Sequence, residues 1–257
     1  MHANDEDARP HQAATVTHPT SEGYVGASMK VFLDVGAHEG STLQAVRDPK
    51  YAFDRIYCFE PAHSCWAALD VVSDPRVTVC RFGLWDRTSE HALYDGGSRG
   101  ASMFEDKFRA PPTEEVASFV RASDWFREHI GADDETYLKL NCEGAECDIV
   151  EDLLESGELA RVRSVMIDPD VRKIPSLAHR ERELRQRLEA SGLTNYFLEE
   201  QVMVGATHRD RIQNWLRVVG AEERSPRTGV RQLAYVISEA RRGHREPLRA
   251  ALHVPPR

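Results

Sequence analysis

The sequence predicts an α/β protein with a mostly parallel sheet and helices on both of its faces. Short apolar runs alternate with segments of helical periodicity along most of the chain, and this alternation is typical of a parallel sheet covered by helices. The chain has 257 residues, of which 41% are hydrophobic. This length and composition are enough to form one sizeable core.

The expected strands are short and apolar, and the expected helices carry apolar residues at helical spacing. We expect strands at residues 31–34, 55–60, 76–82, 137–142, 162–168, 197–204 and 232–238. We expect helices at residues 41–47, 63–72, 145–155, 176–191 and 209–219. Ser176 can cap the fourth helix, and Gly192 is suited to its end.

The segment 87–124 interrupts this alternation. It contains the glycine-rich stretch DGGSRG and the proline pair of APPT, which predict a short hairpin followed by a loop over the sheet edge. Long inserts at the carboxyl ends of parallel strands lie beside the ligand crevice. We therefore expect residues 95–113 to cover a substrate.

Composition limits the function and the location. The net charge of −9 disfavours nucleic acid as a partner, because phosphate contacts need clustered Lys and Arg. The five cysteines form no CxxC pair, which predicts reduced thiols and a cytoplasmic protein. No secretory signal and no apolar stretch of 18 residues is present, so no membrane partner is expected.

The two ends of the chain differ from its centre. Residues 1–28 are polar and lack periodicity, and residues 241–257 are rich in arginine and proline. We interpret the first segment as a disordered tail and the second as a mobile basic tail. Residues 29–240 then form the single folded domain.

The first motif, DVGAHEG at residues 34–40, follows the first strand and opens the first helix. Gly36 allows a tight turn, and Gly40 allows a ligand to approach the backbone. A pyrophosphate would favour the spacing GxGxxG. The acidic Asp34 suits a cationic ligand better, such as S-adenosylmethionine with its sulfonium and ammonium groups. A structural glycine turn, with Asp34 as a helix cap, is the alternative.

The second motif places Glu60 at the end of the second strand, within CFEP at residues 58–61. A carboxylate at this position can accept both hydroxyls of a ribose lying across the strand ends. This holds for S-adenosylmethionine and for NAD alike. Glu60 therefore indicates a nucleoside without distinguishing the two cofactors.

The third motif, YLKLNCEGAE at residues 137–146, gathers polar groups around the end of the fourth strand. They are Lys139, Asn141, Glu143 and Glu146. The two glutamates are also favourable charges for the first turn of a helix. A structural role for both therefore stays open.

Together these motifs resemble the FkbM family of methyltransferases, which typically shows DVGAxxG, FEP and KIDVEGAE in this order. The chain has LDVGAHEG, CFEP and LKLNCEGAE, and the resemblance spans residues 31–192. GLWD at residues 83–86 is similar to the family's ALSD stretch. The third motif, with the other two before it, is the specific part of the resemblance.

The resemblance implies a Rossmann-like class I methyltransferase fold with a mostly parallel, seven-stranded sheet. It implies S-adenosylmethionine as cofactor and a hydroxyl of a small molecule, such as a sugar or a natural-product intermediate, as methyl acceptor. A homo-oligomer is compatible with this class. The expected cofactor-binding residues are Asp34, Gly36, Gly40, Glu60, Gly83, Leu84 and Asn141.

Methyl transfer needs alignment of the acceptor and removal of its proton. We expect Glu143 or Asp168 to be the base and Asn141 to orient substrate or cofactor, with Asp170 and His179 as further candidates for the base. Asn141 stands where the family usually has Asp, and it offers a metal only a neutral amide oxygen. We therefore expect no metal ligands, and a divalent metal stays the less favoured alternative.

Two other functions remain open on the sequence alone. Asn141 in place of Asp is compatible with a methyltransferase-like domain that binds without catalysing. A nicotinamide-dependent oxidoreductase is disfavoured because GxGxxG is missing.

Overall fold

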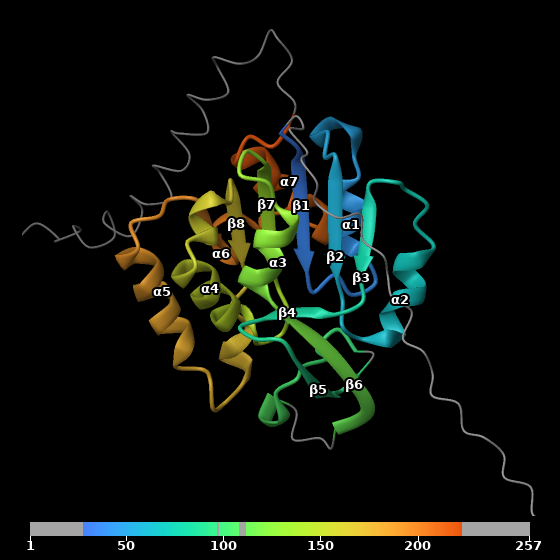
Figure 1. Ribbon diagram of the computed structural model, residues 1–257, viewed down its shortest axis with the longest axis vertical. Coiled ribbons are helices and arrows are strands. Elements are labelled where there is room, and N and C mark those ends of the chain that lie inside the picture. Colours follow the sequence, from blue (N-terminus) through green and yellow to red (C-terminus); the bar gives the residue numbers. More distant parts are fainter. Residues whose placement is uncertain (1–27, 97, 108–111, 223–257) are drawn as a thin grey trace, which may run out of the picture.

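A parallel six-stranded sheet forms the centre of the computed structural model, which describes residues 28–222 except residues 97 and 108–111 (Figure 1). Its order is β3 (Val77–Cys80), β2 (Arg55–Phe59), β1 (Lys30–Val35), β7 (Glu135–Leu140), β8 (Ser164–Ile167) and β9 (Tyr196–Leu198). Every neighbouring pair is parallel. The chain builds outward from β1 to β3 and then returns to the other side of β1. This order is Rossmann-like and places the topological switch point between β1 and β7.

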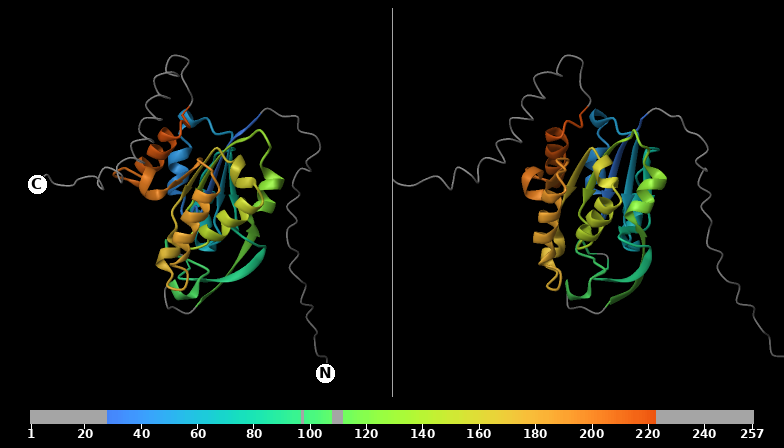
Figure 2. Two further views of the ribbon diagram at one scale, coloured as in Figure 1. Left: turned by 90° about the vertical axis from the view of Figure 1, so that its left-hand side faces the viewer. Right: turned by 60° about the vertical axis from the view of Figure 1, so that its left-hand side comes forward.

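Helices cover both faces of this sheet, as the side views in Figure 2 show. One face carries α3 (Ala122–His129), α4 (Glu146–Glu155) and α5 (Arg180–Ala190). The other face carries α1 (Ser41–Val46) and α7 (His208–Val218). Strand β1 contributes to the hydrophobic core on each face of the sheet. Leu33 packs into the core under α3, α4 and α5, and Phe32 packs into the core under α1 and α7. The alternation of side chains along a strand explains this division.

The remaining elements are short. Helix α2 (His63–Asp70) packs beside β3, and α6 (Glu199–Val202) directly follows β9. Four 3₁₀ turns, η1 to η4, lie at Pro49–Tyr51, Glu105–Lys107, Glu158–Arg161 and Asp170–Lys173. None of the helices in the described part of the chain is long and apolar enough to cross a membrane.

A second sheet lies at the carboxyl ends of β1 and β2 (Figure 1). It contains β4 (Gly83–Trp85), β5 (Ser89–Tyr94) and β6 (Pro112–Arg121), in the order β4-β6-β5. Strand β6 pairs antiparallel with β5 and parallel with β4. The connection between β5 and β6 contains most of the insert that we expected to cover the ligand crevice.

The α/β class and the parallel sheet are confirmed, and two local expectations are wrong. The last part of segment 87–124, where we expected a loop, is regular structure, because Pro112–Arg121 form β6 and α3 begins at Ala122. The strand expected at 197–204 ends at Leu198, where α6 begins. Six strands of the central sheet lie within the described residues. The strand expected at 232–238 and both tails lie outside the described residues.

Candidate ligand-binding site

A cavity of about 270 Å³ lies at the carboxyl ends of β1, β2 and β7. Its floor contains Gly36, Glu60 and Asn141, each of which follows one of these strands. Its cover includes Arg99 and Ser102 from the insert between β5 and β6. The described part of this insert therefore lies over the crevice at the switch point, and its covering of a substrate stays a prediction.

Gly36 is required where the turns after β1 and β7 meet. Its φ is 80°, in the region that favours glycine, and a Cβ atom on it would lie 1.9 Å from the backbone oxygen of Asn141. The amides of Gly36 and Ala37 both donate to the carbonyl of Phe59, at 3.1 and 3.0 Å. A larger residue would therefore separate the strand ends that form the cavity floor.

Glu60 presents a fixed carboxylate to the cavity. Its Oε2 accepts a hydrogen bond from the amide of His38 at 2.7 Å, and its Oε1 accepts one from the amide of Ala62 at 2.8 Å. Burial raises the pKa of Glu60, and these two amides act in the opposite direction. Each carboxylate oxygen has a second lone pair, so Glu60 can also accept from the hydroxyls of a ligand.

Asp34 does not line the cavity. Its Oδ1 lies 2.9 Å from Nζ of Lys139 in a fully buried ion pair. Lys139 also donates to the carbonyl of Gly36 at 2.8 Å. The negative charge of Asp34 is thus matched inside the protein, and it fixes the lysine that supports the turn after β1.

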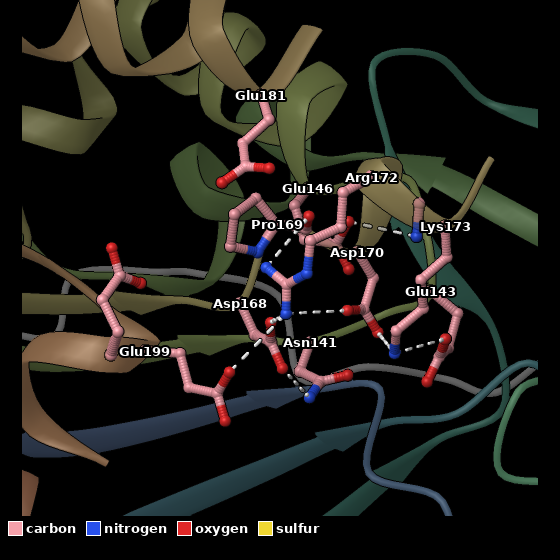
Figure 3. Close-up of polar contacts among 12 residues, drawn as sticks. Asn141, Glu143, Glu146, Asp168, Pro169, Asp170, Arg172, Lys173, Glu181 and Glu199 are labelled. Carbon is pink, nitrogen blue, oxygen red and sulfur yellow. Dashed lines mark hydrogen bonds and ion pairs between the residues drawn. The ribbon is translucent and has the colours of Figure 1, made fainter. Parts of the chain in front are cut away.

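Asn141 links the cavity to an ionic network behind it (Figure 3). Its Nδ2 donates to Oδ2 of Asp168 at 2.9 Å, and Arg172 lies 2.8 Å from the other oxygen of Asp168. Burial and the neighbouring Asp170 raise the pKa of Asp168 to about 7. Asp168 itself does not line the cavity, so it acts on the cavity only through Asn141.

Glu143 lines the cavity, and its charge is already paired. Lys107 of the insert forms an ion pair with Oε2 of Glu143, and Lys173 lies 3.8 Å from the same atom. Ser102 donates to the backbone oxygen of Glu143 at 2.7 Å. Burial raises the pKa of Glu143, against the effect of Lys107. These contacts fasten the insert to the turn after β7.

Glu146 is fully buried and holds that turn together. Its oxygens accept from the amides of Cys142 at 2.7 Å and Gly144 at 3.0 Å. Burial raises the pKa of Glu146 to about 7. The interpretation of Glu146 as a structural charge at the start of a helix agrees with this geometry.

The acids around Asn141 form a charge network with cations (Figure 3). Asp170 is fully buried, and Lys173 donates to its Oδ2 at 2.6 Å. Arg172 lies 3.5 Å from Oδ1 of the same carboxylate. Within the residues that the structure describes, no group of three or more His, Cys, Asp or Glu side chains is arranged to hold a metal ion.

Two histidines line the cavity that the sequence analysis did not assign to it. His208 of α7 hydrogen-bonds to Oγ1 of Thr42 through Nε2, at 2.9 Å. His38 has a φ of 47°, and its buried Nε2 has no hydrogen-bond partner among the described residues. Burial lowers the pKa of both imidazoles. His38 lies inside the first motif and could have been proposed, whereas nothing near His208 in the sequence marks it.

The expected site residues therefore divide into two groups. The cavity is lined by Gly36, Glu60, Gly83, Leu84, Asn141 and Glu143. The structure does not place Asp34, Gly40 and Asp168 on its wall, whereas we expected the first two to bind the cofactor and the third to be a candidate base. Asp34 is paired with Lys139, Gly40 packs against Leu69, and Asp168 lies behind Asn141. His179 is exposed just before α5.

The fold is that of a Rossmann-like α/β protein with a cavity at the switch point of its sheet. A solved structure described as methyltransferase FkbM from Methylobacillus flagellatus KT aligns with 55% of this chain at 19% identity and a TM-score of 0.37. The chain spans about a third of that protein, since the alignment covers 32% of it. An overlap this partial carries no argument about function. No protein-family model and no curated protein matches the chain.

Proposed function

We propose that the chain is an S-adenosylmethionine-dependent methyltransferase that methylates a hydroxyl group of a small molecule. The observation that carries this proposal is Glu60, a fixed carboxylate on the wall of a cavity at the switch point. Ligands of Rossmann-like proteins bind at this point, and a strand-end carboxylate is suited to a ribose diol. The resemblance of the three motifs to the FkbM family supports the same proposal.

The residues present fit this cofactor. Glu60 lines the cavity and has lone pairs left to accept from the ribose hydroxyls. Gly36 also lines this cavity, and its missing side chain lets the turns after β1 and β7 meet at the cavity floor. When bound, S-adenosylmethionine supplies a methyl group attached to a positively charged sulfur.

The protein then has to position the acceptor hydroxyl and exclude water. The insert between β5 and β6 is held over the cavity by the contacts of Ser102 and Lys107 with Glu143. Asn141 faces the cavity with its amide fixed by Asp168 and is suited to orient a polar ligand. Alignment of the reacting groups in such an enclosed site is the main requirement of an in-line displacement.

The test compares ligands and then follows methyl transfer. Calorimetry with S-adenosylmethionine, S-adenosylhomocysteine and NAD should show binding of the first two and none of NAD. Purified protein should then transfer a labelled methyl group to one of a panel of sugar and phenol hydroxyls. Binding of NAD alone would contradict the proposal. Binding of S-adenosylmethionine without transfer to any hydroxyl would favour a binding domain that does not catalyse.

A further inference from the structure

The side-chain amide of Asn141 has one end that is committed to the protein and one end that is open. Its Nδ2 donates to Oδ2 of Asp168 at 2.9 Å. Its Oδ1 accepts no hydrogen bond from the described residues, and this atom is not fully buried. An amide oxygen is a hydrogen-bond acceptor with two lone pairs. Asn141 therefore has an acceptor to offer to a ligand.

This acceptor lies on the cavity side of the amide. Asn141, Cys142 and Glu143 line the cavity, whereas Asp168 does not. Asp168 thus lies behind the cavity wall, and the end of the amide that is turned away from Asp168 is turned toward the cavity. Figure 3 shows Oδ1 of Asn141 pointing away from Asp168. A ligand in the cavity consequently meets an oxygen acceptor at the end of β7.

The protonation state of Asp168 decides which end of the amide it faces. A carboxylate only accepts hydrogen bonds, so an ionised Asp168 requires Nδ2 of Asn141 to face it. Arg172 donates to Oδ1 of Asp168 at 2.8 Å, which leaves Oδ2 as the oxygen that takes up a proton. A protonated Oδ2 is a donor and cannot face a second donor. Half a turn of the amide, which the broad two-fold χ2 preference of asparagine permits, then brings Nδ2 to the cavity.

The surroundings of Asp168 place this exchange near neutral pH. Burial and then the charges of Asp170 and Glu199 raise the pKa of Asp168 to about 7, while Arg172 acts in the opposite direction. The charged groups that act on Asp168 come from η4, α4 and α6, and they are Asp170, Arg172, Lys173, Glu146 and Glu199. A ligand that needs the oxygen of Asn141 should therefore bind more tightly when Asp168 has lost its proton.

We propose that Asp168 is a positioning residue that acts through Asn141. Its carboxylate presents Oδ1 of Asn141 to the cavity as the acceptor for an N–H or O–H group of the ligand, and protonation of Asp168 replaces this acceptor with a donor. The identity of the ligand rests on the proposed methyltransferase function. Two groups then have the right chemistry, the ammonium of the cofactor's amino-acid end and the hydroxyl of the methyl acceptor.

The first test observes the amide without any ligand. The side-chain amide NMR signals of Asn141, identified by their loss in Asn141→Leu, should move with pH around a midpoint of about 7. Asp168→Asn should abolish this movement. Asp124→Asn is the matched control and should retain it, because Asp124 is an exposed acid paired with Arg127. Thermal unfolding checks the fold of each variant. Signals that stay constant between about pH 5 and 9 in the parent would overturn the proposal.

The second test measures the affinity of the cofactor's amino-acid end. Asp168→Asn imitates the protonated acid, because an amide oxygen toward Arg172 leaves an amide nitrogen toward Asn141. By calorimetry, the parent should bind S-adenosylhomocysteine about three- to fivefold more tightly at about pH 8 than at about pH 6. Asn141→Leu and Asp168→Asn should both lose this difference. The parent should show no such difference with 5′-methylthioadenosine, which has the same nucleoside but no amino-acid end.

The two possible donors give different results in these variants. If Asn141 accepts from the methyl acceptor, the affinity for S-adenosylhomocysteine stays at the parent's value. The KM of the hydroxyl compound that the parent methylates then rises by about fivefold in Asn141→Leu and in Asp168→Asn. Parent values of both the affinity and the KM in Asn141→Leu would overturn the proposal. Failure of the parent to bind any nucleoside would instead count against the methyltransferase function, and the NMR titration would still decide whether Asp168 controls the amide.

Discussion

The turn after β2 and the first turn of α4 each contain a glutamate that accepts two backbone hydrogen bonds, but the two glutamates have different surroundings. Glu60 accepts from the amides of His38 and Ala62 and lies on the cavity wall. Glu146 accepts from the amides of Cys142 and Gly144 and is fully buried, away from the wall. The same construction borders the cavity in one place and holds a buried turn in the other. Contact with the cavity, rather than residue type, separates the two.

The largest effect is expected at Gly36 in the turn after β1, whose amide donates to Phe59 of β2 and which lies against the backbone of Asn141 after β7. Gly36→Ala should destabilise the protein by more than about 3 kcal/mol, because its Cβ would collide with the backbone of Asn141 and its φ is unfavourable. Gly157→Ala is the matched control, since it has the same φ of 80° and nothing within 4 Å. It should cost only about 1–2 kcal/mol. Urea unfolding of both variants measures the difference, and equal losses would contradict the described contact.

The next effect concerns Glu146 and pH. Its pKa of about 7 in the folded protein lies above the ordinary value of 4.5. Between pH 4.5 and 7 the folded state therefore binds more protons than the unfolded state. The titration of Glu146 consequently lowers the free energy of unfolding as pH rises through this window. Glu146→Gln should remove up to ~1.4 kcal/mol per pH unit from that slope. Chemical denaturation at pH 5, 6 and 7 tests this, and an unchanged slope would show that Glu146 titrates normally.

The smallest effect is expected at Asp168, which reaches the cavity only through Asn141. Asp168→Asn should change the affinity for S-adenosylmethionine by about 1 kcal/mol or less, the scale of one hydrogen bond. Treatment with a chelator should leave affinity and activity unchanged, because the acids here are paired with Arg172 and Lys173. Activity that chelation abolishes and magnesium restores would show that these acids hold a metal.

Much of the central sheet could be predicted from the sequence because its strands are buried on both faces and read as short apolar runs. Strands 31–34 and 55–60 and helix 41–47 agree with β1, β2 and α1 within one or two residues. Helix α3 was missed because its segment SDWFREH is short and largely polar, and only Trp125 and Phe126 reveal its buried face. Tertiary packing, rather than local propensity, stabilises such a helix.

The site was predictable only where a motif fixes the backbone. Gly36 and Glu60 line the cavity because each directly follows a central strand. Asp34 also lies at a strand end, but its side chain forms an ion pair with Lys139 from the neighbouring strand. That pairing depends on the register of two segments about a hundred residues apart. His208 joins the site through the packing of α7 on α1, which no local pattern reveals.

Calorimetry of S-adenosylmethionine with Glu60→Ala, beside the parent protein, tests the central claim most directly. The account places the ribose on Glu60, so the variant should lose about 1–3 kcal/mol of binding free energy. Asp70→Ala is the control, because Asp70 is an exposed acid of α2 whose ion pair with Arg81 lies on the surface. Loss of affinity in Glu60→Ala alone is the predicted result. Equal affinity of the parent and Glu60→Ala would contradict the assignment of this cavity to the cofactor.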